Sequence, residues 1–521
     1  MKLKYLRIPF IIMLLITVFV VSCKDEWDNH FYTIAANKSE LNLYQYIQSR
    51  SELSKFSEML KVTGYDSILS QSNTYTVWAP NNTALEGVDI HNMDLVTKIV
   101  QTHITRFSYT TAGLSSLSIL MLNNKFIPFA QSGSGFTFGG KTILEPNLAT
   151  ANGIVHILGE YVLYRKNIWE FISQTDGLDS LRAYINSQTT LVLDSAKSFQ
   201  DGVFVDSVKK ETNFIFTNLA AINTEDSIYT AILPNNDAWT EAYSRITPYY
   251  KTLNKDGGSS FQQTISKLIL IKDLFFKGKI TTPVTQDSIE STIGTVFHNP
   301  SRLFSDGQVN EMSNGLSYVS SKLNYTASES WFKEIRIEAE WANYGRITSN
   351  YATSVVSSIG TGYNVSSKYY LTLVPTTSSS ISQLFVNFPL PNTLSAKYNI
   401  YCVILPTRIV DTADVKPNKV KFYLSYVNST GTQVTNAAID ANNEVLSPAG
   451  TSATFTTDPT KINKILVAKD FEFPYSNLTW DVKDPTKPIT VALKVLNAVK
   501  PTESTFNRTL RIDCIILEPV Q

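Results

Sequence analysis

Cysteine, histidine and surplus charge are all scarce in this chain of 521 residues. It has 3 cysteines, 5 histidines and a formal net charge of zero, from 45 basic and 45 acidic residues. A formal net charge of zero argues against nucleic acid, which needs a basic face, so we expect no nucleic-acid partner, although a local basic patch stays open. No histidine stands in a His-Glu-x-x-His spacing, and there is no Gly-x-Ser-x-Gly or Walker motif. We therefore expect no enzymatic activity, no cofactor and no metal site.

Carboxylates, by contrast, are plentiful, so a glycoside hydrolase stays open as a distant alternative. Glu338 and Glu340 lie on the same face of a predicted strand. We interpret that face as solvated, with no catalytic role.

The bulk composition indicates a folded chain of several domains. Hydrophobic residues make up 43% and charged residues 17%, which excludes a disordered protein. At about 150 residues per domain, the length predicts about three domains. The 26 tyrosines and 27 phenylalanines are typical of a strand-rich protein.

Residues 1–22 have the pattern of a signal peptide. Lys2, Lys4 and Arg7 precede an apolar run from Phe10 to Val21, which is shorter than the ~20 residues needed to span a bilayer. The run ends at Ser22 and Cys23 and resembles a bacterial lipobox, which implies acylation of the Cys23 thiol and an outer-membrane anchor. The alternative is an ordinary signal peptide with a cysteine at this place by accident.

The segment after the cysteine, a linker over residues 23–30, begins Lys24-Asp25-Glu26. It resembles the surface-export signal of Bacteroidota lipoproteins, and its alternative is a solvated charged linker. Triplets that consist of Asp, then Ser or Thr, then a small or aliphatic residue resemble the protein O-glycosylation motif of that phylum. Some of these triplets must be helix caps or turns. The triplets begin at Asp66, Asp179, Asp194, Asp206, Asp226, Asp287 and Asp411.

One motif occurs twice and divides the chain. TVWAPNNTAL begins at Thr76 and TAILPNNDAW at Thr230, and each is followed, in the same order, by an Asn-Gly segment: NGIVHIL from Asn152 and NGLSYVS from Asn314. Each first motif predicts a strand that ends at proline, with an asparagine able to cap a helix directly after it. Each Asn-Gly pair predicts a tight turn with positive φ before another strand. Two motifs in one order indicate a duplicated domain.

These motifs resemble the fasciclin domain family. The resemblance implies two tandem α+β modules, over residues 31–165 and 166–327, that serve adhesion or extracellular binding and share no catalytic residues. The second copy departs from the pattern at Leu233, where alanine is usual, and at Tyr318, where histidine is usual.

Two histidines of the first module have a structural interpretation. Leu95, Ile99, His103 and Phe107 are spaced as one apolar stripe of a helix, and His156 lies in the strand of NGIVHIL. We expect both histidines to be hydrogen-bonded in the core.

The last third, residues 328–521, alternates apolar and polar residues in short runs separated by Ser, Thr, Asn and Pro. This pattern predicts an all-β domain, a β-sandwich or jelly roll, and it weakly resembles carbohydrate-binding modules of the galactose-binding-like kind. Cys402 and Cys514 fall on the apolar phase of their strands, either as two buried thiols or as one disulfide.

A glycan site in this domain would need aromatic stacking surfaces and hydrogen-bonding groups. The candidates are Trp341, Tyr344, Arg346, Tyr351, Tyr363, Tyr475 and Trp480; alternatively, these residues belong to the core or the strand edges. We predict an outward-facing outer-membrane lipoprotein that binds an extracellular glycan, as an accessory to a nutrient-uptake transporter complex of the SusC/SusD type. The alternative is an adhesin whose fasciclin-like modules bind host matrix or a cell-surface protein.

Overall fold

The computed structural model describes residues 38–342, 345–360, 363–376, 384–446, 450–478 and 490–520. Contacts divide the chain into two compact units: the first comprises the chain up to Phe171 with Ile222–Ile228 and Glu311–Gly315, and the second comprises the rest. Residues 1–30, with the predicted signal peptide, Cys23 and the linker, lie outside the described residues. No helix in the described ranges is both long and apolar enough to cross a bilayer. The domain boundaries at 165 and 327 stay predictions.

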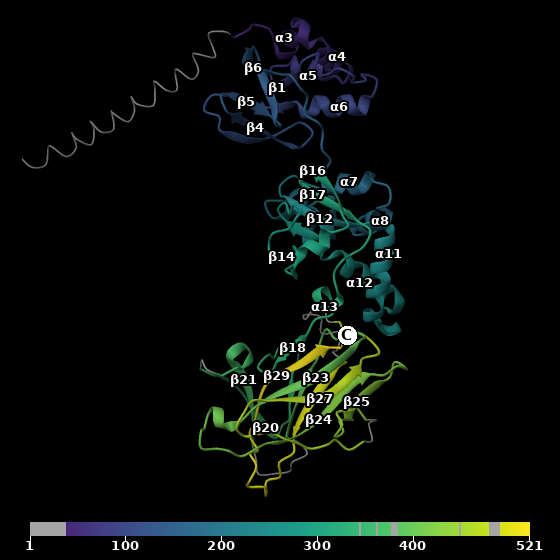
Figure 1. Ribbon diagram of the computed structural model, residues 1–521, viewed down its shortest axis with the longest axis vertical. Helices are drawn as coiled ribbons and strands as arrows, with labels where there is room; N and C mark the ends of the chain where they lie inside the picture. Colours follow the sequence, from purple (N-terminus) through teal and green to yellow (C-terminus); the bar gives the residue numbers. More distant parts are fainter. Residues whose placement is uncertain are drawn as a thin grey trace, which may run out of the picture. The chain divides into compact units, whose positions relative to one another are not determined.

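The first unit is built on a seven-stranded sheet in the order β2-β1-β7-β6-β5-β4-β3 (Figure 1). Its centre pairs the two motifs, because β1 (Tyr75–Pro80) runs parallel to β7 (Gly153–Leu158) and every residue of both strands is buried. The other strands are β2 (Ile104–Arg106), β3 (Ser116–Leu120), β4 (Phe126–Ser132), β5 (Gly135–Phe138) and β6 (Lys141–Thr150).

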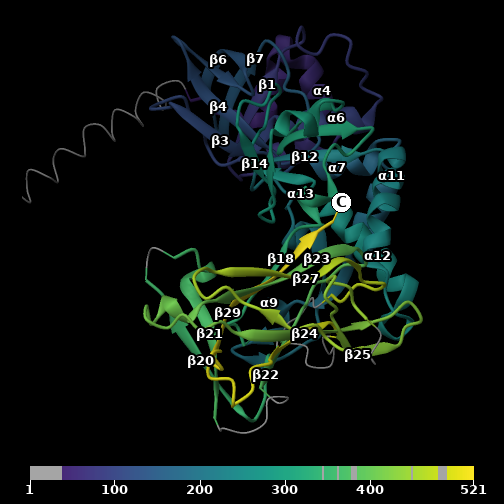
Figure 2. The ribbon, with the colours of Figure 1, turned by 60° about the horizontal axis from the view of Figure 1, so that its bottom comes forward.

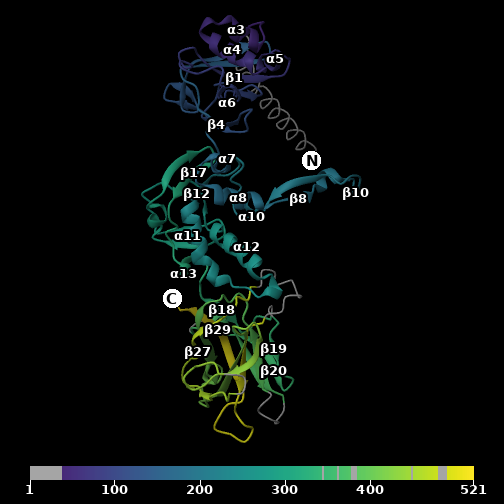
Figure 3. The same ribbon diagram turned by 90° about the vertical axis from the view of Figure 1, so that its right-hand side faces the viewer.

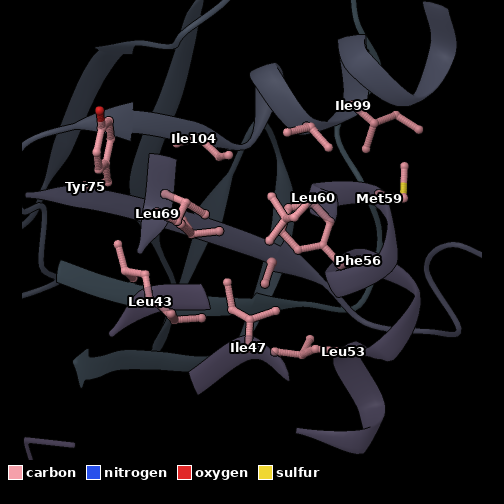
Figure 4. Close-up of a cluster of buried hydrophobic side chains, with 14 of the residues drawn as sticks. Leu43, Ile47, Leu53, Phe56, Met59, Leu60, Leu69, Tyr75, Ile99 and Ile104 are labelled. Atoms are coloured by element: carbon pink, nitrogen blue, oxygen red, sulfur yellow. The ribbon is translucent and has the colours of Figure 1, made fainter. Parts of the chain in front are cut away.

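Short amphipathic helices supply the other side of this core. Figure 4 shows side chains from the helices, such as Leu43, Phe56 and Ile99, gathered with Tyr75 and Ile104 of the strands. The helices are α3 (Leu43–Ser49), η1 (Ser51–Leu53), α4 (Ser54–Val62), α5 (Tyr65–Leu69) and α6 (Met93–Thr102).

The predicted duplication is visible in the sheet order. A four-stranded sheet, β13-β12-β17-β16, repeats the order β2-β1-β7-β6 of the first sheet, and β12 is antiparallel to β13 as β1 is to β2. The four strands are β12 (Tyr229–Pro234), β13 (Phe275–Lys277), β16 (Gln308–Met312) and β17 (Gly315–Ser320), and a separate two-stranded sheet pairs β14 (Ser288–Glu290) with β15 (Val296–His298). The helices are α7 (Ile168–Gln174), α8 (Asp179–Ser187), α10 (Phe214–Asn218), α11 (Asn236–Ile246), η2 (Thr247–Tyr250), η3 (Asn254–Asp256), α12 (Gly258–Ile271), η4 (Pro300–Phe304) and α13 (Ala327–Ser330).

The repeated motif also makes the same hydrogen bonds in both copies. Asn81 Oδ1 accepts from Ala84 N, and Asn235 Oδ1 accepts from Ala238 N, each at 2.8 Å. The asparagine therefore caps α11 in the second copy, whereas in the first it caps a turn.

The second copy carries an extended β-arm over residues 189–213, which Figure 3 shows as a projecting ribbon. It consists of β8 (Thr189–Leu193), α9 (Ser195–Ser198), β9 (Phe199–Gln200), β10 (Val203–Phe204) and β11 (Lys209–Asn213). Its large apolar side chains are exposed, Val203 at 65% and Phe204 at 55%.

The C-terminal part is an all-β sandwich of two six-stranded sheets (Figure 2). The first sheet has the order β20-β21-β29-β23-β27, with β18 beside β29; the second has the order β19-β22-β28-β24-β25, with β26 beside β24. The chain crosses repeatedly between the sheets, as in a jelly roll. Its elements are β18 (Ile335–Glu338), β19 (Ile347–Thr348), β20 (Ala352–Ser358), η5 (Ser366–Lys368), β21 (Tyr369–Pro375), β22 (Phe385–Pro389), β23 (Lys397–Leu405), η7 (Thr407–Ile409), β24 (Lys419–Val427), β25 (Gln433–Ala438), β26 (Phe455–Thr456), β27 (Asn463–Glu472), β28 (Ala492–Asn497) and β29 (Leu510–Pro519).

Several expectations at single residues meet the structure here. His103 and His156 are fully buried and hydrogen-bonded, as predicted. The helical stripe through Phe107 is wrong, because α6 ends at Thr102 and Phe107 follows β2 with φ 73° and 69% exposure. Cys402 and Cys514 are two buried free thiols and form no disulfide.

Candidate functional site

The outward face of the second sandwich sheet forms a basic and aromatic surface. Strict alternation along β24 produces it: Val420, Phe422 and Leu424 are fully buried in the core, whereas the side chains between them point away from it. The outward residues are Lys419, Lys421 and Tyr423, all half-buried. Since they are neither core nor fully solvated, this face is partly enclosed.

Pairing across three strands arranges these residues in two rows. The first row places Lys494 of β28 between Asn387 of β22 and Tyr423 of β24. The second row places Leu496 of β28 between Phe385 and Lys421. Aromatic, cationic and amide groups therefore alternate over one continuous patch.

A groove of about 940 Å³ runs over part of this face. We call it the lysine groove, and its lining residues are Lys419, Lys421, Tyr423, Thr454, Thr456, Leu496, Ala498, Lys500, Pro501, Thr502 and Glu503. Its volume is in the range of sites that hold small molecules or short oligomers.

The charges of the groove are only partly balanced. Lys419 Nζ lies 2.6 Å from Glu503 Oε1 and 3.9 Å from the centroid of the Phe506 ring. In the described part of the chain, Lys421, Lys494 and Lys500 have no carboxylate within salt-bridge distance. One acid, Glu503, therefore lies among the three lysines that line the groove, and Lys494 lies on the same sheet face outside the lining.

Lys494 is held over aromatic rings instead of beside an acid. Its Nζ lies 4.2 Å from the Phe385 centroid and 5.8 Å from the Tyr423 centroid. Burial lowers the pKa of Lys494 and raises that of Tyr423, because each charged form loses water here. Asn387 Oδ1 is buried with no hydrogen-bond partner among the described residues, which leaves an acceptor unused beside this patch.

The site residues predicted from the sequence do not line the lysine groove. Trp341, Tyr351 and Tyr363 are exposed, the first after β18 and the others in separate loops. Arg346 donates to the Ala339 carbonyl, and burial lowers the pKa of its guanidinium. Cys23, Tyr344 and Trp480 lie outside the described residues.

Tyr475 is engaged within the protein. The Lys251 ammonium lies 5.0 Å from the centroid of its ring, and its hydroxyl donates to the Ser429 carbonyl at 3.3 Å. One face of the ring is thereby covered by this chain's own lysine.

Sequence reasoning missed the groove, although a signal for it was present. The apolar phase of the segment KVKFYLSY, which is Val420, Phe422 and Leu424, predicts only a strand with one buried face. Its other phase presents Lys419, Lys421 and Tyr423, an unusual set for a plain solvated face. Which of these residues is partly enclosed depends on the neighbouring strands.

The expectation of a solvated face at Glu338 is wrong. Glu338 is 5% exposed. Its carboxylate lies close to the Asp513 carboxylate and the Cys514 thiol, and the possible ligand atoms of these three groups lie within 4.8 Å of one another. The reason is that β18 pairs with β29, which places Glu338 opposite Cys514. Burial raises the pKa of Glu338, and that of Asp513 to about 6.

This cluster offers three ligand atoms, which is fewer than Zn²⁺ or Ca²⁺ takes in a closed protein site. The Arg336 guanidinium also lies 3.8 Å from Cys514 Sγ and supplies positive charge there. We therefore assign no metal to the cluster, whose two carboxylates both accept hydrogen bonds from Ser366.

The solved structures to which this chain is similar include a fasciclin domain pair, carbohydrate-binding domains and a Paenibacillus xanthan lyase. The FAS1 domain pair of the insect cell adhesion molecule fasciclin I is 16% identical and aligns with 54% of this chain and 98% of its own, at a TM-score of 0.21. A xylan-binding domain from CBM 22 is 13% identical over 36% of this chain and 94% of its own, at a TM-score of 0.20. The CBM22-1–CBM22-2 tandem domain of Paenibacillus barcinonensis Xyn10C is 10% identical over 36% of this chain and 46% of its own, at a TM-score of 0.22.

A search of curated proteins finds no match to this chain. The family model described as Fasciclin domain matches residues 51–164, which confirms for the first unit the resemblance drawn from TVWAPNNTAL and NGIVHIL.

Proposed function

We propose that this protein is a binding protein, not an enzyme, and that its β-sandwich binds an extracellular glycan in the lysine groove. The observation that carries the proposal is the half-buried ring of Tyr423, which lines the groove among threonine hydroxyls and lysines. A flat ring offers a stacking surface to sugar C–H groups, and the hydroxyls can exchange hydrogen bonds with those of a sugar.

The proposal includes the setting predicted from the N-terminal sequence. An anchor on Cys23 and export by Lys24-Asp25-Glu26 would hold the sandwich outside the outer membrane. There it would serve as an accessory subunit of a nutrient-uptake complex of the SusC/SusD type. Fractionation of outer membranes with surface proteolysis, followed by co-purification of a transporter, tests this setting separately from binding.

Affinity electrophoresis of the whole chain, purified in detergent, tests glycan binding on gels that each contain one polysaccharide. We expect retardation by at least one polysaccharide, with loss of retardation in Tyr423→Ala. The matched control is Tyr401→Ala, since Tyr401 lies on β23 of the other sheet under the Lys464 ammonium. Trp341→Ala tests the aromatic loop predicted from the sequence.

The outcomes separate three cases. Loss of retardation in Trp341→Ala, but not in Tyr423→Ala, would move the glycan site to the loop after β18. No retardation by any polysaccharide would contradict glycan binding. Release of shorter sugars during incubation would contradict a purely binding role.

A second candidate function, adhesion through the fasciclin-like part, is favoured by the β-arm. Val203, Phe204 and Leu191 are exposed on it, and exposed apolar groups of this size mark protein contacts. Adhesion predicts that Phe204→Asp weakens attachment to matrix-coated or cell-coated surfaces, whereas Lys210→Glu on the same arm does not. Equal attachment of both variants would contradict it.

A further inference from the structure

We propose that the ligand of the lysine groove is an anionic glycan, with carboxylate or sulfate groups on its sugars. The inference rests on the proposed glycan binding and specifies its ligand class. It starts from the charges on this sheet face, where Glu503 pairs with Lys419 and lies beside Lys500. Lys421, in the lining of the groove, and Lys494, in the neighbouring row of the sheet, have no acid within salt-bridge distance in the described ranges.

The imbalance is local, because the whole chain has a formal net charge of zero. Elsewhere in the described sandwich, lysines such as Lys397 and Lys469 also have no acid within salt-bridge distance, whereas other lysines are paired. For example, Lys464 of β27 is bonded to Glu518, and it lies 4.2 Å from the Tyr401 centroid. Lys464 and Lys494 therefore share the same lysine-over-aromatic geometry, but only Lys464 has an acid beside it.

The position of Lys494 makes an anionic partner favourable. It lies between Asn387 and Tyr423 in one row of the sheet, and its ammonium is partly desolvated by the rings on either side. A desolvated cation gains more from an opposite charge than one in bulk water does. An incoming carboxylate or sulfate would therefore be bound more strongly here than at an exposed lysine.

Lys421 supplies the second positive charge on the same face. It lies opposite Leu496, with Phe385 at the other end of the same row, so Leu496 and Phe385 lie beside both Lys421 and the row of Lys494. Apolar surface flanked by two cations suits a polymer of acidic sugars, whose ring faces are apolar and whose substituents are charged. Thr454, Thr456 and Thr502 add hydroxyl groups along the lining for the sugar hydroxyls.

Calorimetry on the whole chain in detergent tests this inference with pairs of polymers that share a backbone. Polygalacturonate is compared with its fully methyl-esterified form, and dextran sulfate with dextran. We expect the charged member of at least one pair to bind at least tenfold more tightly, with an affinity that falls as salt is raised. Which pair shows the difference distinguishes carboxylate from sulfate.

Three variants connect this selectivity to the groove. Lys421→Gln and Lys494→Gln should each weaken binding of the charged polymer about fivefold or more and reduce its salt dependence. Lys464→Gln, the matched control on the other sheet, should leave binding unchanged. A thermal melt of each variant shows whether the fold is retained.

Each other outcome has a definite meaning. Equal binding of charged and neutral members, unaffected by Lys421→Gln and Lys494→Gln, would overturn the anionic ligand but leave glycan binding standing. Equal binding of oligo(dT) or polyglutamate, unaffected by Tyr423→Ala, would also overturn it, because the groove would then be a general polyanion surface. No binding by any polysaccharide would contradict the proposed function itself.

Discussion

Asn152 and Asn314 occupy equivalent positions and make the same three hydrogen bonds in the two copies of the duplicated fold. The Asn152 amide accepts from Leu43 N at the start of α3 and donates to the carbonyls of Leu69 and Gln71. The Asn314 amide accepts from Ile168 N at the start of α7 and donates to the carbonyls of Ile222 and Thr224. One side chain thus joins a helix start to the segment before the central strand, in each copy.

Replacing either asparagine should therefore destabilise the protein markedly. Asn314→Ala leaves one backbone N–H and two carbonyls without their partner at a fully buried position, so we expect a loss of about 3 kcal/mol. Asn152→Ala should cost less, because Asn152 is only half-buried. Urea unfolding measures both, with Asn186→Ala at an exposed position of α8 as the control. Losses below about 0.5 kcal/mol would contradict the equivalence.

Gly153 should not tolerate a side chain, for a reason other than the one predicted. The Asn-Gly turn was expected to need positive φ, but in the first copy the requirement is close packing: a Cβ on Gly153 would lie 2.0 Å from the Tyr75 carbonyl oxygen. Gly153→Ala must push β7 away from β1, which we expect to cost about 3 kcal/mol. Gly135→Ala is the control, since its Cβ would meet only Ser132 O at 3.9 Å. Equal melting temperatures for the two variants would contradict this explanation.

Acid should weaken the first unit through its two buried histidines. Burial lowers the pKa of His103 and of His156 to about 4. One nitrogen of each ring also accepts a backbone N–H, from Val162 in His103 and from Asn147 in His156, which leaves no site for a second proton. The unfolded state binds protons near pH 6.5 and the folded state does not, so stability is full above pH 6.5 and falls towards pH 4.

The expected loss by pH 5 is about 2 kcal/mol for each histidine. Urea unfolding at pH 7 and pH 5 measures it, and His103→Gln should have a smaller pH dependence than the parent chain. His91→Gln is the matched control, because His91 is exposed. An unchanged dependence in His103→Gln would show that other groups cause the acid effect.

Lys125 should be needed to keep two acids together in the first unit. Its ammonium lies 2.9 Å from Glu170 Oε2 and 2.7 Å from Glu225 Oε1, and its side chain is 5% exposed. Lys125→Met leaves the buried Glu225 carboxylate without its cation, with an expected cost of about 3 kcal/mol. Lys141→Met removes the exposed pair with Glu160 and should cost less than about 1 kcal/mol. Similar losses for both variants, measured by urea unfolding, would contradict the difference in burial.

Much of the fold was determined by the sequence alone. The repeated strand-Pro-Asn-Asn motif, the two Asn-Gly segments and the change to period-two alternation after residue 328 predicted two similar α+β modules and a β-sandwich. These predictions succeed because they rest on local rules: proline ends a strand, asparagine caps a turn or helix, and alternation assigns one phase of a strand to the core. The same alternation placed Cys402 and Cys514 in the core.

Tertiary structure decided what covers each face and which residues meet. Alternation predicts that Glu338 and Ile337 lie on opposite faces of their strand. Only the pairing of β18 with β29 buries Glu338 beside Asp513. The need for Gly153 arises from Tyr75, a residue far away in the sequence. Likewise, Lys421, Lys494 and Tyr423 form one surface because β24 and β28, which are far apart in the sequence, lie side by side, and local patterns do not predict which strands pair.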